Sequence, residues 1–277
     1  MDFDPARPPG PPREAAAVIL VRPADHTGAA DAPEGDVEVL LVRRPAKAAF
    51  MAQAFVFPGG ARDGEEDARV TAARELVEET GVLLAARPVP GAALAALRGR
   101  AAAGEPLAEL LAGEGLALDL DAMLPFAHWV TPSAERRRFS ARFFLAVLPA
   151  GQVATIDGQE LVEARWVTPR DALAQAAELH LPPPQLRTVW ELRAVTSVSQ
   201  ALELSRARAP HVRPLLPRFA PLPDAPGGFA LLLAWDPDYE ALGTGEAAPL
   251  PADHPLAGGP GRFVLDEGVW RQVGPSS

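Results

Sequence analysis

The chain has 277 residues, 48% of them hydrophobic, which is enough to bury one large domain or one domain with an extension. Its formal net charge of −10 argues against proteins that coat nucleic acids or membrane surfaces, since those rely on clustered Lys and Arg. No Cys occurs, which excludes disulfides, zinc thiolates and cysteine nucleophiles.

The N-terminal segment has no features of a targeting signal. Residues 1–13 are acidic and proline-rich, and we expect them to form a flexible tail rather than a signal peptide with a basic start and an apolar run. The longest apolar runs are far shorter than the roughly 20 residues that a membrane helix needs. We therefore expect a cytoplasmic protein with no membrane or nucleic-acid partner.

The first elements of the chain are strands followed by one helix. Apolar runs predict strands at residues 15–22, 36–44 and 55–57. A Gly/Pro/Asp-rich loop separates the first two. The helix is predicted from the N-cap Asp67 to Thr80, with Gly81 in the position that commonly ends helices.

The rest of the chain mixes strands and helices irregularly. Residues 83–123 are Ala-rich and predict a helical insertion that shapes either the substrate pocket or a homodimer contact. Further strands are predicted at 124–132, 137–149, 160–167, 228–235 and 262–270, and helices at 168–178 and 182–208. This order favours a mixed α/β (α+β) fold over an all-parallel sheet. We expect a domain over residues 14–205, with a C-terminal extension over 206–277 packed on it.

The helix after Asp67 carries an unusual group of carboxylates. At about 100° per residue, Glu75, Glu78 and Glu79 fall on one face, opposite an apolar stripe. Carboxylates so close repel one another, and Arg74 can neutralise only part of that charge through its i+4 spacing to Glu78. Mg²⁺ or Mn²⁺, which prefer carboxylate and carbonyl oxygens, would offset the rest.

From Gly60 to Val82 the sequence fits the pattern G-x5-E-x7-R-E-U-x-E-E-x-G-U, where U is a bulky apolar residue, without a mismatch. This is the complete Nudix box, and the chain is identified by it as resembling the Nudix hydrolase superfamily. The resemblance implies a mixed β-sheet sandwiched between α-helices. It also implies metal-dependent hydrolysis within the pyrophosphate of a nucleoside diphosphate linked to another moiety.

The resemblance also implies roles for the residues of the box. Glu75 and Glu79 match the principal metal ligands, and Glu78 matches a further ligand or a base. Arg74 matches the residue that orients a box glutamate by ion pairing. The Gly60 carbonyl commonly completes the metal site, and Glu66 is more often a structural partner.

Other stretches of the sequence indicate which branch of the superfamily the chain resembles. "FMAQAFVFPGG", "WVTPSAERRRFSARFFLAVLP" and "DGQELVEARWVTP" resemble the large Nudix proteins related to the peroxisomal-type coenzyme A diphosphatases. The separate coenzyme A signature of bacterial Nudix proteins is absent, because its Arg and Gly positions hold Ala49 and Gln53. Coenzyme A or an acyl-CoA is the leading substrate because of the resemblance to this branch, and the signature does not support it. The alternative substrates are ADP-ribose, NADH, dinucleoside polyphosphates or modified nucleoside triphosphates. A second alternative is that the chain is a non-catalytic module that binds a nucleotide.

Residues outside the box supply further candidates. Glu160 and Glu163 are candidates for the general base, which in this superfamily often lies on a later loop or strand. For both Glu160 and Glu163, an ordinary position on a solvated strand face is an equally good interpretation. Candidate contacts to the anionic substrate are Arg43, Arg44, Lys47, Arg137 and Arg138, with Trp129 as a candidate for base stacking. For the cations the competing interpretation is a solvated surface, and for Trp129 it is a place in the core.

Overall fold

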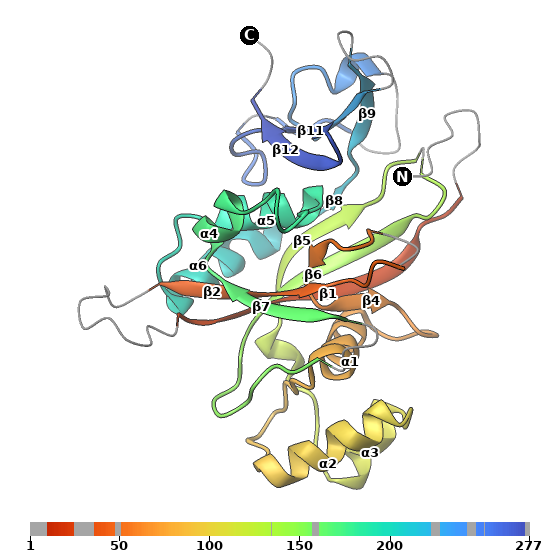
Figure 1. Cartoon of the computed structure of the whole chain (residues 1–277), viewed down its shortest axis with the longest axis vertical. Coiled ribbons are helices and arrows are strands. Elements are labelled where there is room, and N and C mark those ends of the chain that lie inside the picture. Colours follow the sequence, from red (N-terminus) through yellow and green to blue (C-terminus); the bar gives the residue numbers. More distant parts are fainter. Residues whose placement is uncertain are drawn as a thin grey trace.

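The structure is a computed structural model that describes residues 10–24, 36–47, 51–133, 135–156, 161–222, 228–242, 248–251 and 253–274. Within these ranges the chain forms an eight-stranded and a four-stranded sheet, with helices on both faces of the larger one (Figure 1). The predicted mixed α/β fold is confirmed.

The central sheet is built around β1 (Arg13–Pro23), which runs parallel to β6 (Phe139–Val147) and antiparallel to β2 (Val37–Arg43). Its other strands are β3 (Phe55–Val56), β4 (Gly59–Ala61), β5 (Leu124–Val130), β7 (Glu163–Val167) and β8 (Pro214–Leu215). The strand order is β3-β2-β1-β6-β5-β8, with β4 paired to β1 and β7 paired to β2.

The apolar run in β1 is continuous because both faces of this strand are buried. Ala17, Ile19 and Val21 enter one hydrophobic core. The intervening Val18 and Leu20 enter a second core on the opposite face. A strand covered on both sides loses the apolar–polar alternation of a half-exposed strand. β1 therefore separates the two layers that hold the functional elements.

α1 (Ala68–Thr80) begins and ends where the sequence predicts. The Asp67 side chain accepts a hydrogen bond from the Arg69 amide at 2.8 Å, and Gly81 adopts a left-handed φ of 65°. Leu76 is fully buried against the central sheet, whereas Glu78 on the other face is exposed. The predicted amphipathic helix is confirmed.

α2 (Gly91–Ala102) and α3 (Leu107–Gly113) lie beyond α1, on the side away from the sheet (Figure 1). Val77 of α1 packs with Leu94 and Leu110 in a small core of its own. The Arg98 guanidinium also donates to the Gly81 carbonyl at the end of α1. The helical pair is thus attached to the helix that carries the glutamates. None of the helices in the described ranges is both long and apolar enough to cross a membrane.

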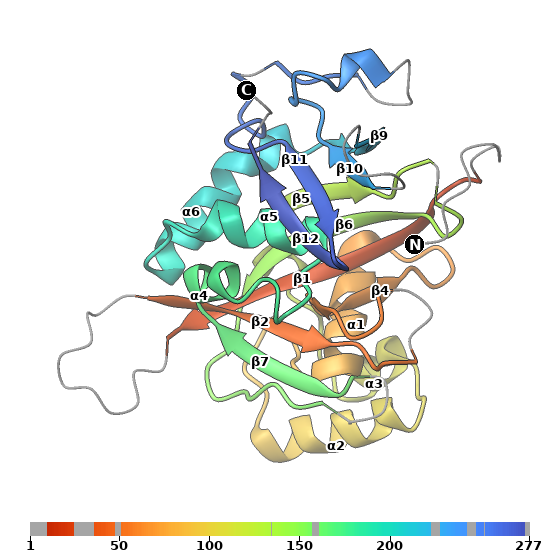
Figure 2. The ribbon, with the colours of Figure 1, turned by 45° about the horizontal axis from the view of Figure 1, so that its top comes forward.

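The opposite face of the sheet is covered by α4 (Pro169–Ala174), α5 (Pro183–Leu192) and α6 (Val198–Arg208) (Figure 2). The prediction of one longer helix over 182–208 is wrong, because the chain leaves the helix after Leu192. Ser197 starts α6 as an N-cap, its hydroxyl accepting a hydrogen bond from the Gln200 amide at 3.2 Å. This local cap makes a new helix more favourable than continuation of α5.

The C-terminal segment forms an antiparallel sheet in the order β12-β11-β10-β9. Its strands are β9 (Arg218–Pro221), β10 (Phe229–Leu232), β11 (Arg262–Asp266) and β12 (Val269–Val273). The prediction of a single strand over 262–270 is wrong, because Glu267 and Gly268 have positive φ values of 48° and 81° and reverse the chain. Such a two-residue turn joins strands into a hairpin.

Arg187 of α5 attaches the C-terminal segment to the rest of the molecule. Its side chain is 3% exposed and donates to the carbonyls of Pro260, at 3.2 Å, and Gly258. Its Nε donates to Glu191 at 2.8 Å. Glu191 also pairs with Arg208 of α6. One buried cation network therefore joins two helices and the loop that leads to β11.

We expect Arg187→Met to lower the free energy of unfolding by about 2–4 kcal/mol, because it leaves buried carbonyls without a donor and removes a buried charge pair. Arg206→Met is the matched control on the exposed side of α6 and should change stability by no more than about 0.5 kcal/mol. Urea denaturation of both variants measures the difference. Equal stability of the two would contradict a clamping role for Arg187.

Candidate active site

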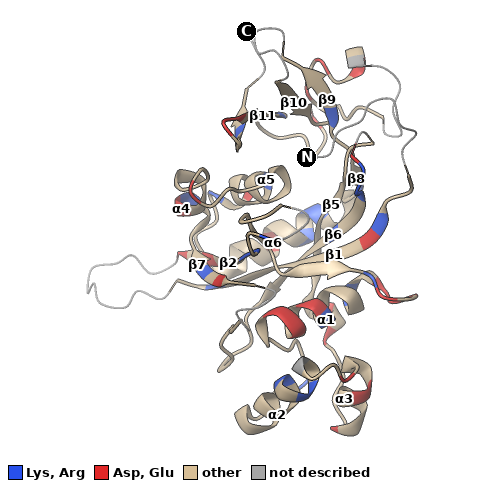
Figure 3. Cartoon of the chain, turned by 45° about the vertical axis from the view of Figure 1, so that its right-hand side comes forward, with Lys and Arg blue, Asp and Glu red and all other residues tan. Residues whose placement is uncertain are grey.

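Acidic residues are concentrated on α1 (Figure 3), and two of them, Glu75 and Glu78, pair with Arg74. The Arg74 Nη1 atom lies 2.9 Å from Glu75 Oε1 and 2.9 Å from Glu78 Oε2, the latter at the expected i+4 spacing. Its Nε lies 3.1 Å from Glu66 Oε1. Its Nη2 donates to the Ala61 carbonyl at 3.0 Å. Arg74 therefore links the helix to the loop that precedes it.

The electrostatics of this cluster keep Arg74 charged. Burial alone would lower the pKa of its guanidinium, but the hydrogen bond to Glu66 and the charges of Glu75 and Glu78 raise that pKa above its ordinary value. Arg74 is thus a fixed positive charge at every physiological pH.

Two glycines let the backbone come close to these carboxylates. A Cβ atom at Gly60 would lie 2.5 Å from both carboxylate oxygens of Glu75, so no larger residue leaves that side chain in place. A Cβ atom at Gly59 would lie 2.3 Å from the Ala16 carbonyl oxygen of β1. The Gly59 amide donates to Glu79 Oε2 at 2.8 Å. Close backbone packing therefore requires a glycine at position 59, whereas a larger residue at position 60 would displace the Glu75 carboxylate.

The residues of this cluster fit a divalent cation by chemical type. Among the described residues, no three acidic or histidine side chains are gathered closely enough to hold a metal ion as they stand. Arg74 and the Gly59 amide engage oxygens of the box glutamates. The donors are nonetheless the hard oxygens that Mg²⁺ and Mn²⁺ prefer. The Glu75 carboxylate lies against Gly60, at the place that a Cβ atom would occupy.

A large cleft of about 1250 Å³ opens beside Gly59 and Gly60. Its lining residues come from both the central sheet and the C-terminal sheet, whose arrangement is shown in Figure 1. Its walls come from β1, the loop before β3, the connection between β5 and β6, the start of α5, and all four strands of the C-terminal sheet. The volume exceeds the roughly 300–1,000 Å³ of a pocket for a drug-sized ligand, so an elongated molecule fits.

The cleft is lined by cations although the chain is acidic overall. The arginines on its walls are Arg13, Arg44, Arg136 and Arg137. Glu135, which is 8% exposed, also lines it. The buried Nε of Arg44 has no hydrogen-bond partner among the described residues. A concave surface with this excess of positive charge attracts anionic ligands.

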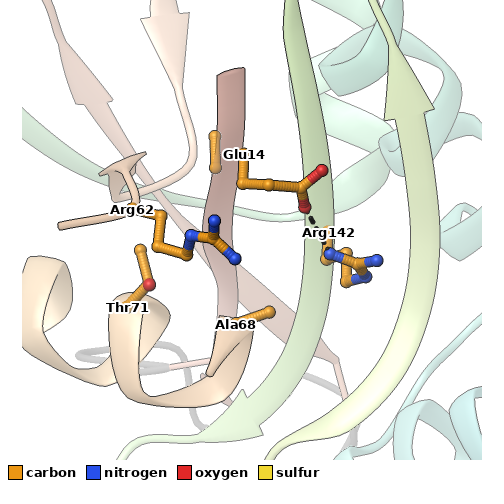
Figure 4. Close-up of a pocket in the computed structure, with 6 residues that line it drawn as sticks. Glu14, Arg62, Ala68, Thr71 and Arg142 are labelled. Atoms are coloured by element: carbon orange, nitrogen blue, oxygen red, sulfur yellow. Dashed lines mark hydrogen bonds and ion pairs between the residues drawn. The ribbon is translucent and has the colours of Figure 1, made fainter. Parts of the chain in front are cut away.

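A second, small pocket lies where β1, β6 and the start of α1 meet (Figure 4). It is lined by Glu14, Arg62, Thr71 and Arg142, with Glu14 and Arg142 joined by an ion pair of 2.6 Å. Its volume of about 20 Å³ has room for little more than a water molecule. The large cleft is therefore the only one of these two pockets that could hold a substrate.

The structure places some of the predicted substrate-binding residues in the wall of the cleft and others outside it. Arg44, Arg137 and Trp129 line the cleft. Arg138 is 5% exposed and does not, because its side chain donates to the carbonyls of Thr131 and Gly10 at 3.1 and 2.8 Å. Lys47 lies in an exposed turn.

Of the predicted base candidates, Glu163 pairs with Arg43 at 3.4 Å and with Arg165 at 2.9 Å, and neither Glu163 nor Arg43 lines the cleft. Glu160 lies outside the described residues. Its role as a base stays a prediction.

Comparisons with known proteins agree with this architecture. The NUDIX domain model matches residues 11–100, and the NUDT19 Nudix domain model matches residues 63–193. The crystal structure of a NUDIX hydrolase from Alicyclobacillus acidocaldarius is 30% identical, with a TM-score of 0.59 over 70% of this chain and 96% of that one. The chain belongs to the Nudix hydrolases.

Two curated relatives share the sequence over part of their length. Human acyl-coenzyme A diphosphatase NUDT19 is 31% identical over 160 residues, which are 51% of this chain and 43% of that protein. A Caenorhabditis elegans protein named nudix hydrolase 7 is 30% identical over 171 residues, which are 58% of this chain and 56% of that protein. The chain thus spans about half the length of these relatives.

Several residues of the cleft were not singled out in the sequence. Arg13, Arg136 and Glu135 come from ordinary loop or strand-end positions, and Leu265 and Trp270 come from the C-terminal sheet. The apolar alternation of the last strands signals a buried face, but only the packing of the two sheets shows what that face meets.

We expect Gly60→Ala to abolish stabilisation by Mn²⁺, because the added methyl group displaces the Glu75 carboxylate. Saturating Mn²⁺ should raise the wild-type Tm by about 5 °C. Gly99→Ala is the matched control, since nothing lies within 4 Å of a Cβ atom at that helical position. Differential scanning calorimetry with and without Mn²⁺ measures each shift. An undiminished shift in Gly60→Ala would remove Glu75 and Gly60 from the metal site.

Proposed function

We propose that this chain is a Mg²⁺- or Mn²⁺-dependent pyrophosphohydrolase that cuts within the diphosphate of a nucleoside diphosphate conjugate, with coenzyme A or an acyl-CoA as the preferred substrate. The carrying observation is that Gly59 and Gly60, which lie against Glu79 and Glu75 of the complete Nudix box, also form part of the wall of an arginine-lined cleft. The similarity to human acyl-coenzyme A diphosphatase NUDT19 supports the substrate class.

In this proposal the chemistry is divided among the residues of the box. Glu75, Glu79, Glu78 and the Gly60 carbonyl would hold the cations. When bound, such cations neutralise phosphate oxygens and lower the pKa of water, which supplies the nucleophile. Arg74 orients Glu75 and Glu78 through its Nη1 atom, and the Gly59 amide holds Glu79 through a hydrogen bond of 2.8 Å.

The cleft arginines supply the second part of the mechanism. A diphosphate is strongly anionic, and Arg44 and Arg137 offer guanidinium groups that pair well with phosphate oxygens. Fixed cations in a concave site stabilise charge without reorganising during the reaction. These residues would therefore place the scissile diphosphate next to the glutamates.

The substrate assignment is tested with purified enzyme and a panel of coenzyme A, ADP-ribose, NADH, a dinucleoside polyphosphate and a modified nucleoside triphosphate. Coenzyme A should be cleaved with the largest kcat/KM, giving an adenine mononucleotide and a phosphorylated pantetheine fragment on chromatography. Intact coenzyme A beside cleaved ADP-ribose would overturn the coenzyme A assignment. That result would not contradict the proposed pyrophosphohydrolase activity.

The catalytic assignment is tested by Glu79→Gln, which removes one carboxylate charge without changing side-chain size. We expect kcat to fall at least about 100-fold, as for loss of a group that stabilises the transition state, while circular dichroism stays unchanged. Glu65→Gln is the control, because Glu65 is exposed just before α1 and is not a conserved position of the box pattern. Turnover that survives both Glu79→Gln and a chelator would refute the metal mechanism.

A further inference from the structure

We propose that the C-terminal sheet forms an apolar subsite for an alkyl or acyl chain attached to the substrate. This inference rests on the proposed function, because it assigns a further part of the same cleft. The residues that carry it are Phe219, Leu231, Leu265 and Trp270, one from each strand of that sheet.

The strand register puts these four side chains on one face. Leu231 is paired with Phe219 on one side and with Phe263 on the other. Leu265, two residues beyond Phe263 on the same strand, is paired with Trp270. Paired residues and residues two apart point to the same side of a sheet. All four therefore face the cleft together.

Aromatic packing holds this face in place. Phe229 makes edge-to-face contacts with Phe219 and Trp270, at centroid distances of 5.0 and 5.9 Å. Leu231 is 4% exposed and belongs to the main hydrophobic core. The subsite is thus an outer edge of that core, with its side chains already ordered before a ligand arrives.

The opposite wall of the cleft is apolar as well. Phe57, Trp129 and Phe143 of the central layer line it, and Phe57 and Phe143 pack edge to face at 6.0 Å. The arginines and the Gly59–Gly60 segment provide the polar part of the same cleft. A substrate with an anionic part and a hydrocarbon part matches this division.

The chemistry of the four side chains favours a hydrocarbon over a nucleobase. Apart from the indole N–H of Trp270, none of them can donate or accept a hydrogen bond. The polar edges of a base buried against them would be left unpaired, which is unfavourable. An alkyl chain needs no such partners, and each buried methylene strengthens binding by about three- to fourfold.

The test compares coenzyme A with decanoyl-CoA by isothermal titration of Glu79→Gln, in which turnover is suppressed. Decanoyl-CoA should bind at least about tenfold more tightly than coenzyme A, and a series of shorter acyl chains should give intermediate affinities. Equal affinities along the series would overturn the subsite. Because the series uses a single protein, this result does not depend on the folding of any C-terminal variant.

Leu265→Gln, added to Glu79→Gln, should reduce the affinity ratio of decanoyl-CoA to coenzyme A to about threefold or less, since it replaces a cleft-lining apolar side chain by an amide. Val264→Gln is the matched control: it is the neighbouring residue on the same strand, points to the other face and does not line the cleft. An equal fall in both variants would overturn the assignment of Leu265.

Hydrolysis by the wild-type enzyme separates the two proposals. Absence of coenzyme A cleavage together with a chain-length preference in binding would refute the proposed function and keep the subsite. Coenzyme A cleavage without a chain-length preference in binding would keep the proposed function and refute the subsite.

Discussion

The repulsion among the carboxylates of α1 is the constraint on which the site depends. Glu66, Glu75 and Glu78 are all within hydrogen-bonding distance of the one guanidinium of Arg74. Because that group also donates to the Ala61 carbonyl, it fixes the helix to the loop and strand that carry Gly60. A neutral residue at position 74 would leave the cluster with neither its charge partner nor its link to β4.

The central strand β1 transmits this arrangement to the rest of the molecule. On one face its side chains pack with α1, and on the other they join the core that contains residues of α5, α6 and the C-terminal sheet. Its backbone meets Gly59 so closely that a side chain there would collide with the Ala16 carbonyl. The acidic cluster and the cleft are therefore positioned by the same strand.

Features encoded by neighbouring residues could be predicted from the sequence, whereas those set by distant contacts could not. The ends of α1 follow from Asp67 and Gly81, and the contact between Arg74 and Glu78 follows from helical spacing. The break between α5 and α6 depends on whether a cap at Ser197 outweighs continuing the helix, and propensity alone does not decide that competition. The approach of β9–β12 to the central sheet depends on the buried Arg187 network, whose partners lie about 70 residues further along the chain.

The proposed division of the cleft into an anionic part and a hydrocarbon part has a consequence for specificity. In the proposed mechanism, bond cleavage would require the diphosphate to reach the α1 glutamates, whatever is attached to it. Contacts more distant from the reacting bond contribute binding that can be used for orientation there. Since the C-terminal sheet is anchored by Arg187 rather than by α1, its cleft-lining side chains can differ without disturbing the glutamate cluster. Under the proposed function, such a division would let one hydrolytic site serve different conjugates through changes confined to residues such as Leu265 and Trp270.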